Sequence, residues 1–170
     1  MATVVMAVLF AGAAPQPPPP DAAGAAVRKF YSIYKVMPNY GIPDSPDLAR
    51  LAPLMSRRLN RLIAAALKYR SGLACGDCKP PWSDGNFFTS NVEGYTTFAV
   101  DAAVLDKAGW RVPVRFEYVD AADPKNPGRW TDVAHVIQQR GAYVIDDISF
   151  GAEWPYANHG LLSEALIERW

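Results

Sequence analysis

The sequence has no excess of either charge and few metal-ligating side chains, and these absences narrow the functions it can serve. Its 170 residues hold 17 Lys plus Arg and 17 Asp plus Glu, so the formal net charge is zero. A neutral chain has no overall electrostatic attraction to nucleic acid or to an anionic membrane. The two histidines, His135 and His159, form no close-spaced pair that would complete a zinc site with two cysteines. We therefore expect no metal site and no nucleic-acid partner.

Sequence motifs for several common chemistries are also missing. The chain has no phosphate-binding loop, no G-x-G-x-x-G fingerprint, no G-x-S-x-G nucleophile elbow and no H-E-x-x-H zinc motif. These absences argue against nucleotide-dependent chemistry, serine hydrolysis and metalloprotease action in their usual forms. We expect no cofactor.

No apolar run is long enough to span a bilayer, but a short one opens the chain. Thr3 to Ala14 is apolar and small, and Ala11-Gly12-Ala13 supplies the small residues that signal peptidase prefers. We predict a signal peptide at 1–14, a Pro/Ala-rich linker at 15–24 and one domain at 25–170, in a periplasmic or secreted protein. The apolar run lacks a preceding Lys or Arg, so the alternative is a disordered Ala-rich tail. The cleavage point has no Cys for lipid attachment.

The rest of the chain changes from a helical period to a strand period, which predicts an α+β fold. Apolar residues at helical spacing predict two amphipathic helices, and alternation then predicts antiparallel strands, a hairpin at Arg140-Gly141 and a closing helix. A sheet of this length curls, and we expect helices on its concave side with a pocket between them. The helical positions are Val27, Phe30, Tyr31 and Tyr34, then Leu59, Leu62, Ile63, Ala66 and Leu67; the strands are 95–105, 112–118, 130–139 and 142–150.

Three titratable residues in the predicted strands are the candidate catalytic groups. Asp146 and Asp147 are adjacent, so strand alternation sends them to opposite faces and they cannot form a carboxylate dyad. The inward one could act as a general base in an apolar pocket, and the alternative is a structural Asp bonded to backbone amides or to an Arg. His135 lies mid-strand among apolar residues, where a structural role and an acid/base role both remain open.

Two further groups have alternative interpretations. The aromatic residues of the first helix and the strands could line the expected pocket, and the alternative is ordinary core packing. Cys75 and Cys78 form a C-x-x-C motif, which favours a small structural disulfide in an oxidising compartment; redox catalysis, a zinc site and free thiols are the alternatives. The pocket-lining candidates are Tyr31, Tyr34, Phe98, Phe116 and Tyr118.

Three spaced motifs resemble one known family. Residues 27–34 (VRKFYSIY), 85–90 (GNFFTS) and 143–150 (YVIDDISF) are similar to the bacterial envelope family named domain of unknown function 3828, which includes YbjP-type lipoproteins. The resemblance covers about Ala25 to Leu166 and implies a fold like nuclear transport factor 2, also called cystatin-like. Because that family has no assigned reaction, the resemblance implies no activity. Tyr143 stands where the family pattern leads us to expect Trp.

The leading hypothesis is a non-enzymatic binding module, in the periplasm or secreted, for an envelope protein or a small apolar ligand. One alternative is a cofactor-free isomerase- or dehydratase-like enzyme using one buried Asp or His in a cone-shaped pocket. Another is an immunity-type inhibitor of an envelope toxin, and a third is a structural homodimer formed through the sheet. An enzyme needs an open cavity with one of the three titratable residues at its floor.

Overall fold

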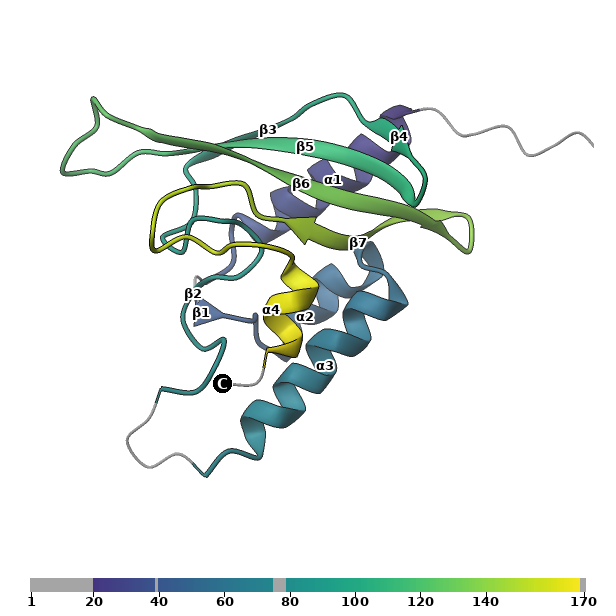
Figure 1. Ribbon diagram of the computed structural model, residues 1–170, viewed down its shortest axis with the longest axis horizontal. Helices are drawn as coiled ribbons and strands as arrows, with labels where there is room; N and C mark the ends of the chain where they lie inside the picture. Colours follow the sequence, from purple (N-terminus) through teal and green to yellow (C-terminus); the bar gives the residue numbers. More distant parts are fainter. Residues whose placement is uncertain (1–19, 39, 75–78, 169–170) are drawn as a thin grey trace, which may run out of the picture.

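The computed structural model describes residues 20–38, 40–74 and 79–168, and in this part of the chain it is an α+β fold (Figure 1). Three N-terminal helices pack on a five-stranded antiparallel sheet, and a short helix follows the last strand. The predicted fold class is therefore confirmed. The elements are α1 (Pro20–Tyr34), β1 (Tyr40–Gly41), α2 (Ser45–Leu51), a 3-10 turn η1 (Ala52–Leu54), α3 (Arg57–Ser71), β2 (Gly85–Asn86), β3 (Thr97–Val100), β4 (Val104–Asp106), β5 (Gly109–Tyr118), β6 (Gly128–Gln139), β7 (Ala142–Ser149) and α4 (Leu162–Ile167).

The sheet runs β3-β5-β6-β7, with β4 pairing the other half of β5. The predicted hairpin joins β6 to β7, and both turn residues, Arg140 and Gly141, have positive φ, as a tight two-residue turn requires. The strand expected over 95–105 is two short strands, because the chain leaves the ladder at residues 101–103. A separate parallel pair, β1 and β2, lies outside this sheet.

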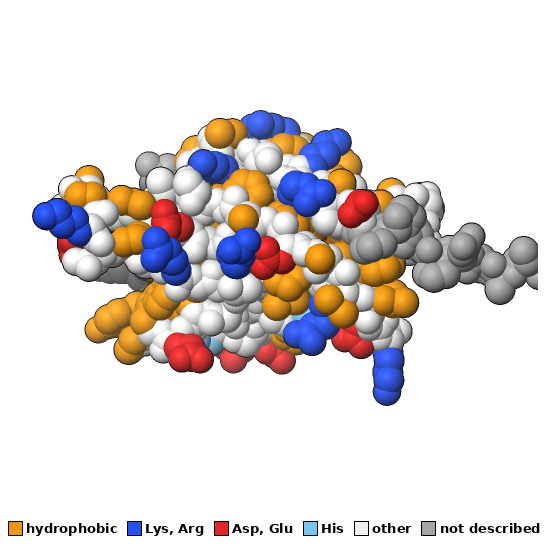
Figure 2. All heavy atoms as spheres, turned by 90° about the horizontal axis from the view of Figure 1, so that it is seen from above, with side chains coloured by type: hydrophobic (Ala, Val, Ile, Leu, Met, Phe, Trp, Pro, Cys, Tyr) orange, Lys and Arg blue, Asp and Glu red, His pale blue; other side chains and the backbone are white. Residues whose placement is uncertain are grey.

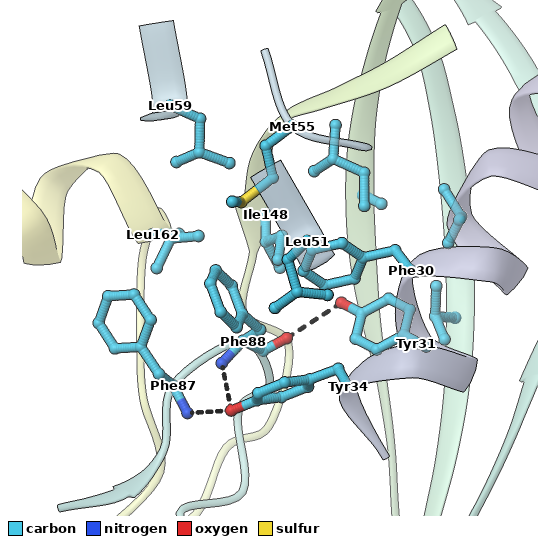
Figure 3. Close-up of a cluster of buried hydrophobic side chains, with 14 of the residues drawn as sticks. Phe30, Tyr31, Tyr34, Leu51, Met55, Leu59, Phe87, Phe88, Ile148 and Leu162 are labelled. Atoms are coloured by element: carbon cyan, nitrogen blue, oxygen red, sulfur yellow. Dashed lines mark hydrogen bonds between the residues drawn. The ribbon is translucent and has the colours of Figure 1, made fainter. Parts of the chain in front are cut away.

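Helix α1 packs against the sheet through the apolar face predicted from its spacing. Val27, Phe30, Tyr31 and Tyr34 are all buried, and the two Tyr hydroxyls reach the loop after β2 (Figure 3). Tyr31 donates to the carbonyl of Phe88 at 3.0 Å. The hydroxyl of Tyr34 accepts the backbone N–H of Phe87 at 2.8 Å. Burial raises the pKa of both tyrosines well above the usual value, so both hydroxyls stay neutral at physiological pH. The face is therefore core, with its polar atoms satisfied by backbone.

Helices α3 and α4 lie beside β7, on the opposite side of the molecule from β4 and β5 (Figure 1). Leu59, Ile63 and Ala66 form the buried face of α3, as the apolar stripe predicted. Single bridges from Met55 to Ile145 and from Leu161 to Ser149 occupy part of the outer edge of β7. The chain thereby covers an edge that would otherwise expose unpaired backbone groups.

One local boundary differs from the prediction. Helix α1 begins at Pro20, so residues 20–24, assigned to the linker, are helical and Ala23 is fully buried. Asp44 caps α2, because its carboxylate accepts the backbone N–H of Asp47 at 3.1 Å. The predicted signal peptide, the first half of the linker (15–19) and the Cys75–Cys78 motif lie outside the described residues.

The upper face of the molecule in Figure 1 is the face that Figure 2 shows, and it carries charged side chains of both signs. Figure 2 shows Lys and Arg interspersed with Asp, Glu and hydrophobic side chains on this face. Among the described residues, no helix combines the length and apolar character that crossing a membrane requires.

Candidate functional site

The two adjacent acids of β7 do not follow strand alternation. His135 pairs with Asp147 and Val136 pairs with Ile145, so Asp146 is an extra residue at a β-bulge. A bulge leaves one residue unpaired and redirects its side chain. The prediction that Asp146 and Asp147 point to opposite faces is therefore wrong, because it assumed a regular ladder.

Arg58, at the start of α3, holds both carboxylates. Its Nε lies 3.0 Å from Oδ2 of Asp146, and its Nη2 lies 3.0 Å from Oδ2 of Asp147. The Nη2 group also donates to the carbonyl of Asp146 at 2.8 Å. Burial lowers the pKa of Arg58, but the bonds to Asp147 and Asp146 outweigh it and the net shift is upward. The arrangement is an ion-paired triad rather than two carboxylates sharing a proton.

Asp147 also caps α4 from another element. The helix begins after Leu161, whose apolar side chain cannot accept a hydrogen bond from the first turn. Asp147 accepts the backbone N–H of Ser163 at 3.0 Å and its hydroxyl at 2.5 Å. It also accepts the backbone N–H of Ile148 at 2.9 Å. With Arg58 included, this carboxylate has four donors. It is therefore bonded as expected for a structural Asp, the alternative to a general base.

His135 lies directly opposite Asp147 in the ladder and is half-buried. Its Nε2 lies 2.6 Å from Oγ of Ser149, and either atom can donate, depending on the ring tautomer. Burial lowers the pKa of His135 below its usual value, and Arg111 lowers it further while Asp147 opposes the shift. A neutral imidazole next to a hydroxyl is the arrangement that general-base chemistry uses.

These residues border a hollow of about 200 Å³, which we call the histidine hollow. Its floor carries all three predicted catalytic candidates, so the structure brings Asp146, Asp147 and His135 together. The two carboxylates are engaged with Arg58, and His135 bonds the hydroxyl of Ser149. Its lining is completed by Asp106, Ala108, Gly109, Trp110, Arg111, Val136, Ile137 and Leu161.

Asp132, which the sequence analysis did not single out, is the most deeply buried acid. It is fully buried and accepts from Thr89 Oγ1 and the backbone N–H of Ser90, each at 2.9 Å, and from Ser90 Oγ. The backbone N–H of Gly151 at 3.0 Å and Trp130 Nε1 at 3.2 Å complete the set. Asp132 thus ties the loop after β2 to β6 and to the end of β7. The sequence could have indicated this role, because Asp132 alternates with the apolar residues Trp130 and Ala134 on the core-facing side of a strand.

The aromatic residues predicted to line a cone-shaped pocket lie in or beside the core. Tyr31, Tyr34 and Phe116 are buried, and Phe98 and Tyr118 pack against them. Ring centroids of Tyr31 and Phe116 are 5.1 Å apart at an interplanar angle of 74°, which is a favourable edge-to-face contact. Phe98 and Phe116 also border a hollow of about 360 Å³ on the sheet. A ligand role for this group stays a prediction.

A larger hollow lies between β2, α4 and the segment before β2, and we call it the aromatic pocket. Its volume is about 570 Å³, within the range of about 300–1,000 Å³ that small-molecule sites occupy. Its walls are mainly apolar, from Trp82, Phe87, Phe150 and Leu162. Its full lining is Leu73, Lys79, Pro81, Trp82, Asp84, Asn86, Phe87, Phe150, Asn158, Leu162 and Ala165.

Backbone contacts fix Trp82 at the wall of this pocket. Its indole Nε1 donates to the carbonyl of Ala165 at 2.9 Å, and its own carbonyl accepts from Arg70 and from the backbone N–H of Ile42, each at 3.0 Å. Trp82 has a φ of 52°, an uncommon conformation for a bulky residue. The segment 79–82 (KPPW) therefore builds one wall of the pocket.

Within the described ranges, no three or more His, Cys, Asp or Glu side chains are grouped so that they could hold a metal ion. No family model, no curated protein and no solved structure matches this chain. The comparisons therefore assign no family, and the structure shows an α+β architecture with N-terminal helices on an antiparallel sheet. Any assignment of function rests on the histidine hollow and the aromatic pocket.

Proposed function

We propose that the protein is an exported, non-enzymatic binding module that takes a small apolar ligand in the aromatic pocket. The observation that carries the proposal is the pocket itself: about 570 Å³, with walls from Trp82, Phe87, Phe150 and Leu162. Such walls remove apolar ligand surface from water, and that is the main driving force for binding.

The hydrogen bonding of the buried acids supports binding over catalysis. A general base needs a free lone pair within reach of the proton it takes. Asp132 accepts bonds from four residues and Asp147 from three, so each holds protein groups in place. Their removal would disturb the fold before it disturbed any reaction.

Export and the finer fold assignment belong to the same proposal. The apolar run 3–14 and Ala11-Gly12-Ala13 support a cleaved signal peptide. Helices on an antiparallel sheet support the resemblance to the nuclear transport factor 2 or cystatin-like fold. N-terminal sequencing of the protein from its native host should begin at or after Ala14, and intact Met1 in the cytosol would contradict export.

Filling the pocket tests the binding proposal. Ala165 lines the pocket from α4 and is partly exposed, so Ala165→Phe places a ring in the hollow without removing a contact. We expect apolar ligands to raise the melting temperature of the wild type with concentration, and to leave that of Ala165→Phe unchanged. The matched control is Ala108→Phe, which narrows the histidine hollow instead. Equal shifts in wild type and Ala165→Phe would contradict this site.

One observation favours a second function, a cofactor-free enzyme that uses His135. Its Nε2 is 2.6 Å from Ser149 Oγ at the edge of the histidine hollow, and its pKa is lowered by burial, which keeps the base neutral. Chemical conversion of any bound ligand, abolished by His135→Gln while the melting temperature is kept, would establish it. Binding with no product in either protein would leave the binding module as the function.

A further inference from the structure

Trp82 borders a second, smaller hollow as well as the aromatic pocket, and we call it the α3–α4 hollow. Its volume is about 150 Å³, and none of its described lining residues is charged. Of the described residues, Trp82 alone lines both hollows, so the two meet at this side chain. The rest of its lining is Leu62, Ala65, Ala66, Tyr69, Leu166 and Ile167.

Helix α4 borders both hollows, with different residues. Leu162 and Ala165 line the aromatic pocket, whereas Leu166 and Ile167 line the α3–α4 hollow. The indole Nε1 of Trp82 donates to the carbonyl of Ala165 at 2.9 Å, which attaches the ring to α4 between these two pairs of residues. The indole therefore lies at the boundary between the two hollows.

This boundary is apolar, because the polar groups of Trp82 are already bonded. The indole N–H is used by α4, and the Trp82 carbonyl accepts from Arg70 and from the backbone N–H of Ile42, each at 3.0 Å. Tyr69 packs against the ring from α3, with ring centroids 6.3 Å apart at an interplanar angle of 65°. An aliphatic chain that crosses the indole therefore meets carbon atoms on its way from one hollow to the other.

Charged side chains border only one of the two hollows. Lys79 and Asp84 line the aromatic pocket, are exposed, and form an ion pair with each other. The described lining of the α3–α4 hollow is uncharged. A polar head group is therefore favoured at the hydrated rim of the aromatic pocket, and an aliphatic tail is favoured in the α3–α4 hollow.

We propose that the ligand of the aromatic pocket is an elongated molecule whose unbranched aliphatic chain crosses Trp82 and ends in the α3–α4 hollow. The inference rests on the proposed binding function and adds the shape and chemical class of the ligand. A compact ligand would leave the apolar walls of the α3–α4 hollow in contact with water. A chain that enters this hollow removes that surface from water, so each methylene group buried there strengthens binding.

Two neighbouring alanines of α3 provide matched variants. Ala64 and Ala65 are both exposed, and of the two only Ala65 lines the α3–α4 hollow. Ala65→Phe fills this hollow, and Ala64→Phe places the same ring elsewhere on the helix. Straight-chain primary alcohols from butanol to decanol are titrated into the full chain by calorimetry.

We expect the wild type and Ala64→Phe to bind the alcohols about fourfold more tightly for each added methylene group. Ala65→Phe should lose this gain for the longest alcohols, and should bind decanol at least about tenfold more weakly than the wild type, the equivalent of two methylene groups. Equal affinity of the wild type and Ala65→Phe for decanol, or an equal loss in Ala64→Phe, would overturn the inference and leave the aromatic pocket as the site.

A spectroscopic measurement keeps the test valid if Ala65→Phe does not fold. In the wild type, the methyl signals of Leu166 in NMR spectra should shift with decanol and stay in place with butanol, which is too short to cross Trp82. Leu166 signals that do not move with bound decanol would overturn the inference. Failure of the wild type to bind any of the alcohols would overturn the proposed binding function together with the inference.

Discussion

Ser90 is held by Asp132 through both its backbone N–H and its hydroxyl. The Ser90 hydroxyl oxygen in turn accepts the backbone N–H groups of Gly151 and Ala152, at 2.9 and 3.1 Å. One acid and one hydroxyl therefore connect the loop after β2, strand β6 and the segment after β7. The same loop supplies Phe87 to the aromatic pocket, so the buried network also positions the proposed site.

Asp132→Ala should lower the free energy of unfolding by about 3 kcal/mol or more, because several buried donors lose their acceptor at once. Urea denaturation followed by Trp fluorescence measures the change. Asp120→Ala, in the exposed loop between β5 and β6, is the control and should stay within about 0.5 kcal/mol of the wild type. A loss below about 1 kcal/mol for Asp132→Ala would show that the network is not a stabilising one.

The two acids of β7 should differ in their contribution to stability. Asp147, whose side chain is 10% exposed, caps α4 and binds Arg58, so Asp147→Ala should cost about 2–3 kcal/mol. The Asp146 side chain is 23% exposed and its carboxylate bonds Arg58, which is itself 43% exposed, so Asp146→Ala should cost about 1 kcal/mol or less. Chemical denaturation of both variants gives the comparison. Equal losses would contradict the capping role of Asp147.

The regular elements could be predicted from the sequence, because local periodicity determines them. The stripe from Val27 to Tyr34 gave α1 its buried face, and Arg140-Gly141 gave the β6–β7 hairpin. The bulge at Asp146 could not be predicted in the same way. A bulge depends on which residues the neighbouring strand presents, and strand alternation alone carries no such information.

The site was predicted only in part, for a related physical reason. Asp146, Asp147 and His135 do meet in one hollow, since they lie on adjacent strands. Arg58 joins them from a helix 88 residues earlier in the chain than Asp146. The aromatic pocket was not identified, because Trp82, Phe150 and Leu162 come from three separate segments. Tertiary packing brings these segments together, and no local sequence pattern predicts which segments will meet.

His135 should make stability depend on pH. Its pKa is lowered by burial and by Arg111, against the opposing effect of Asp147, Asp106 and Asp146. The unfolded chain then binds more protons than the folded one as pH falls through about 6.5, the ordinary pKa of His. The stability that neutral His135 contributes is fully present above a pH of about 6.5, and it is lost as pH falls towards the pKa of His135 in the folded protein.

His135→Gln removes the titrating group, so the stability difference between wild type and variant isolates it. We expect this difference to shift against the wild type as pH falls from about 7.5 to about 5, measured by urea denaturation at each pH. The shift should be small, because His135 is half-buried and water stabilises part of its charge. A difference that is constant with pH, or that moves in favour of the wild type on acidification, would contradict the lowered pKa.

Gly41 and Gly141 form a matched pair for testing how the aromatic pocket is built. Both have positive φ, 76° and 81°, so an Ala at either position adopts an unfavourable backbone conformation, costing about 1–2 kcal/mol. Around Gly141 a Cβ would meet open space, whereas at Gly41 it would overlap the carbonyl of Trp82. Gly41→Ala should therefore lower the free energy of unfolding by at least about 1 kcal/mol more than Gly141→Ala.

Gly41→Ala and Gly141→Ala should also differ in their affinity for a ligand of the aromatic pocket. Relief of the overlap at Gly41 requires Trp82 to move, and Trp82 is a wall of the aromatic pocket. We expect Gly41→Ala to weaken binding of a small apolar fluorescent probe such as 2-phenylindole, and Gly141→Ala to leave that binding unchanged, when both are titrated at a temperature where each variant is folded. If Gly41→Ala binds the probe as tightly as the wild type does, then Trp82 does not shape the site, and the pocket proposed for ligand binding must be relocated.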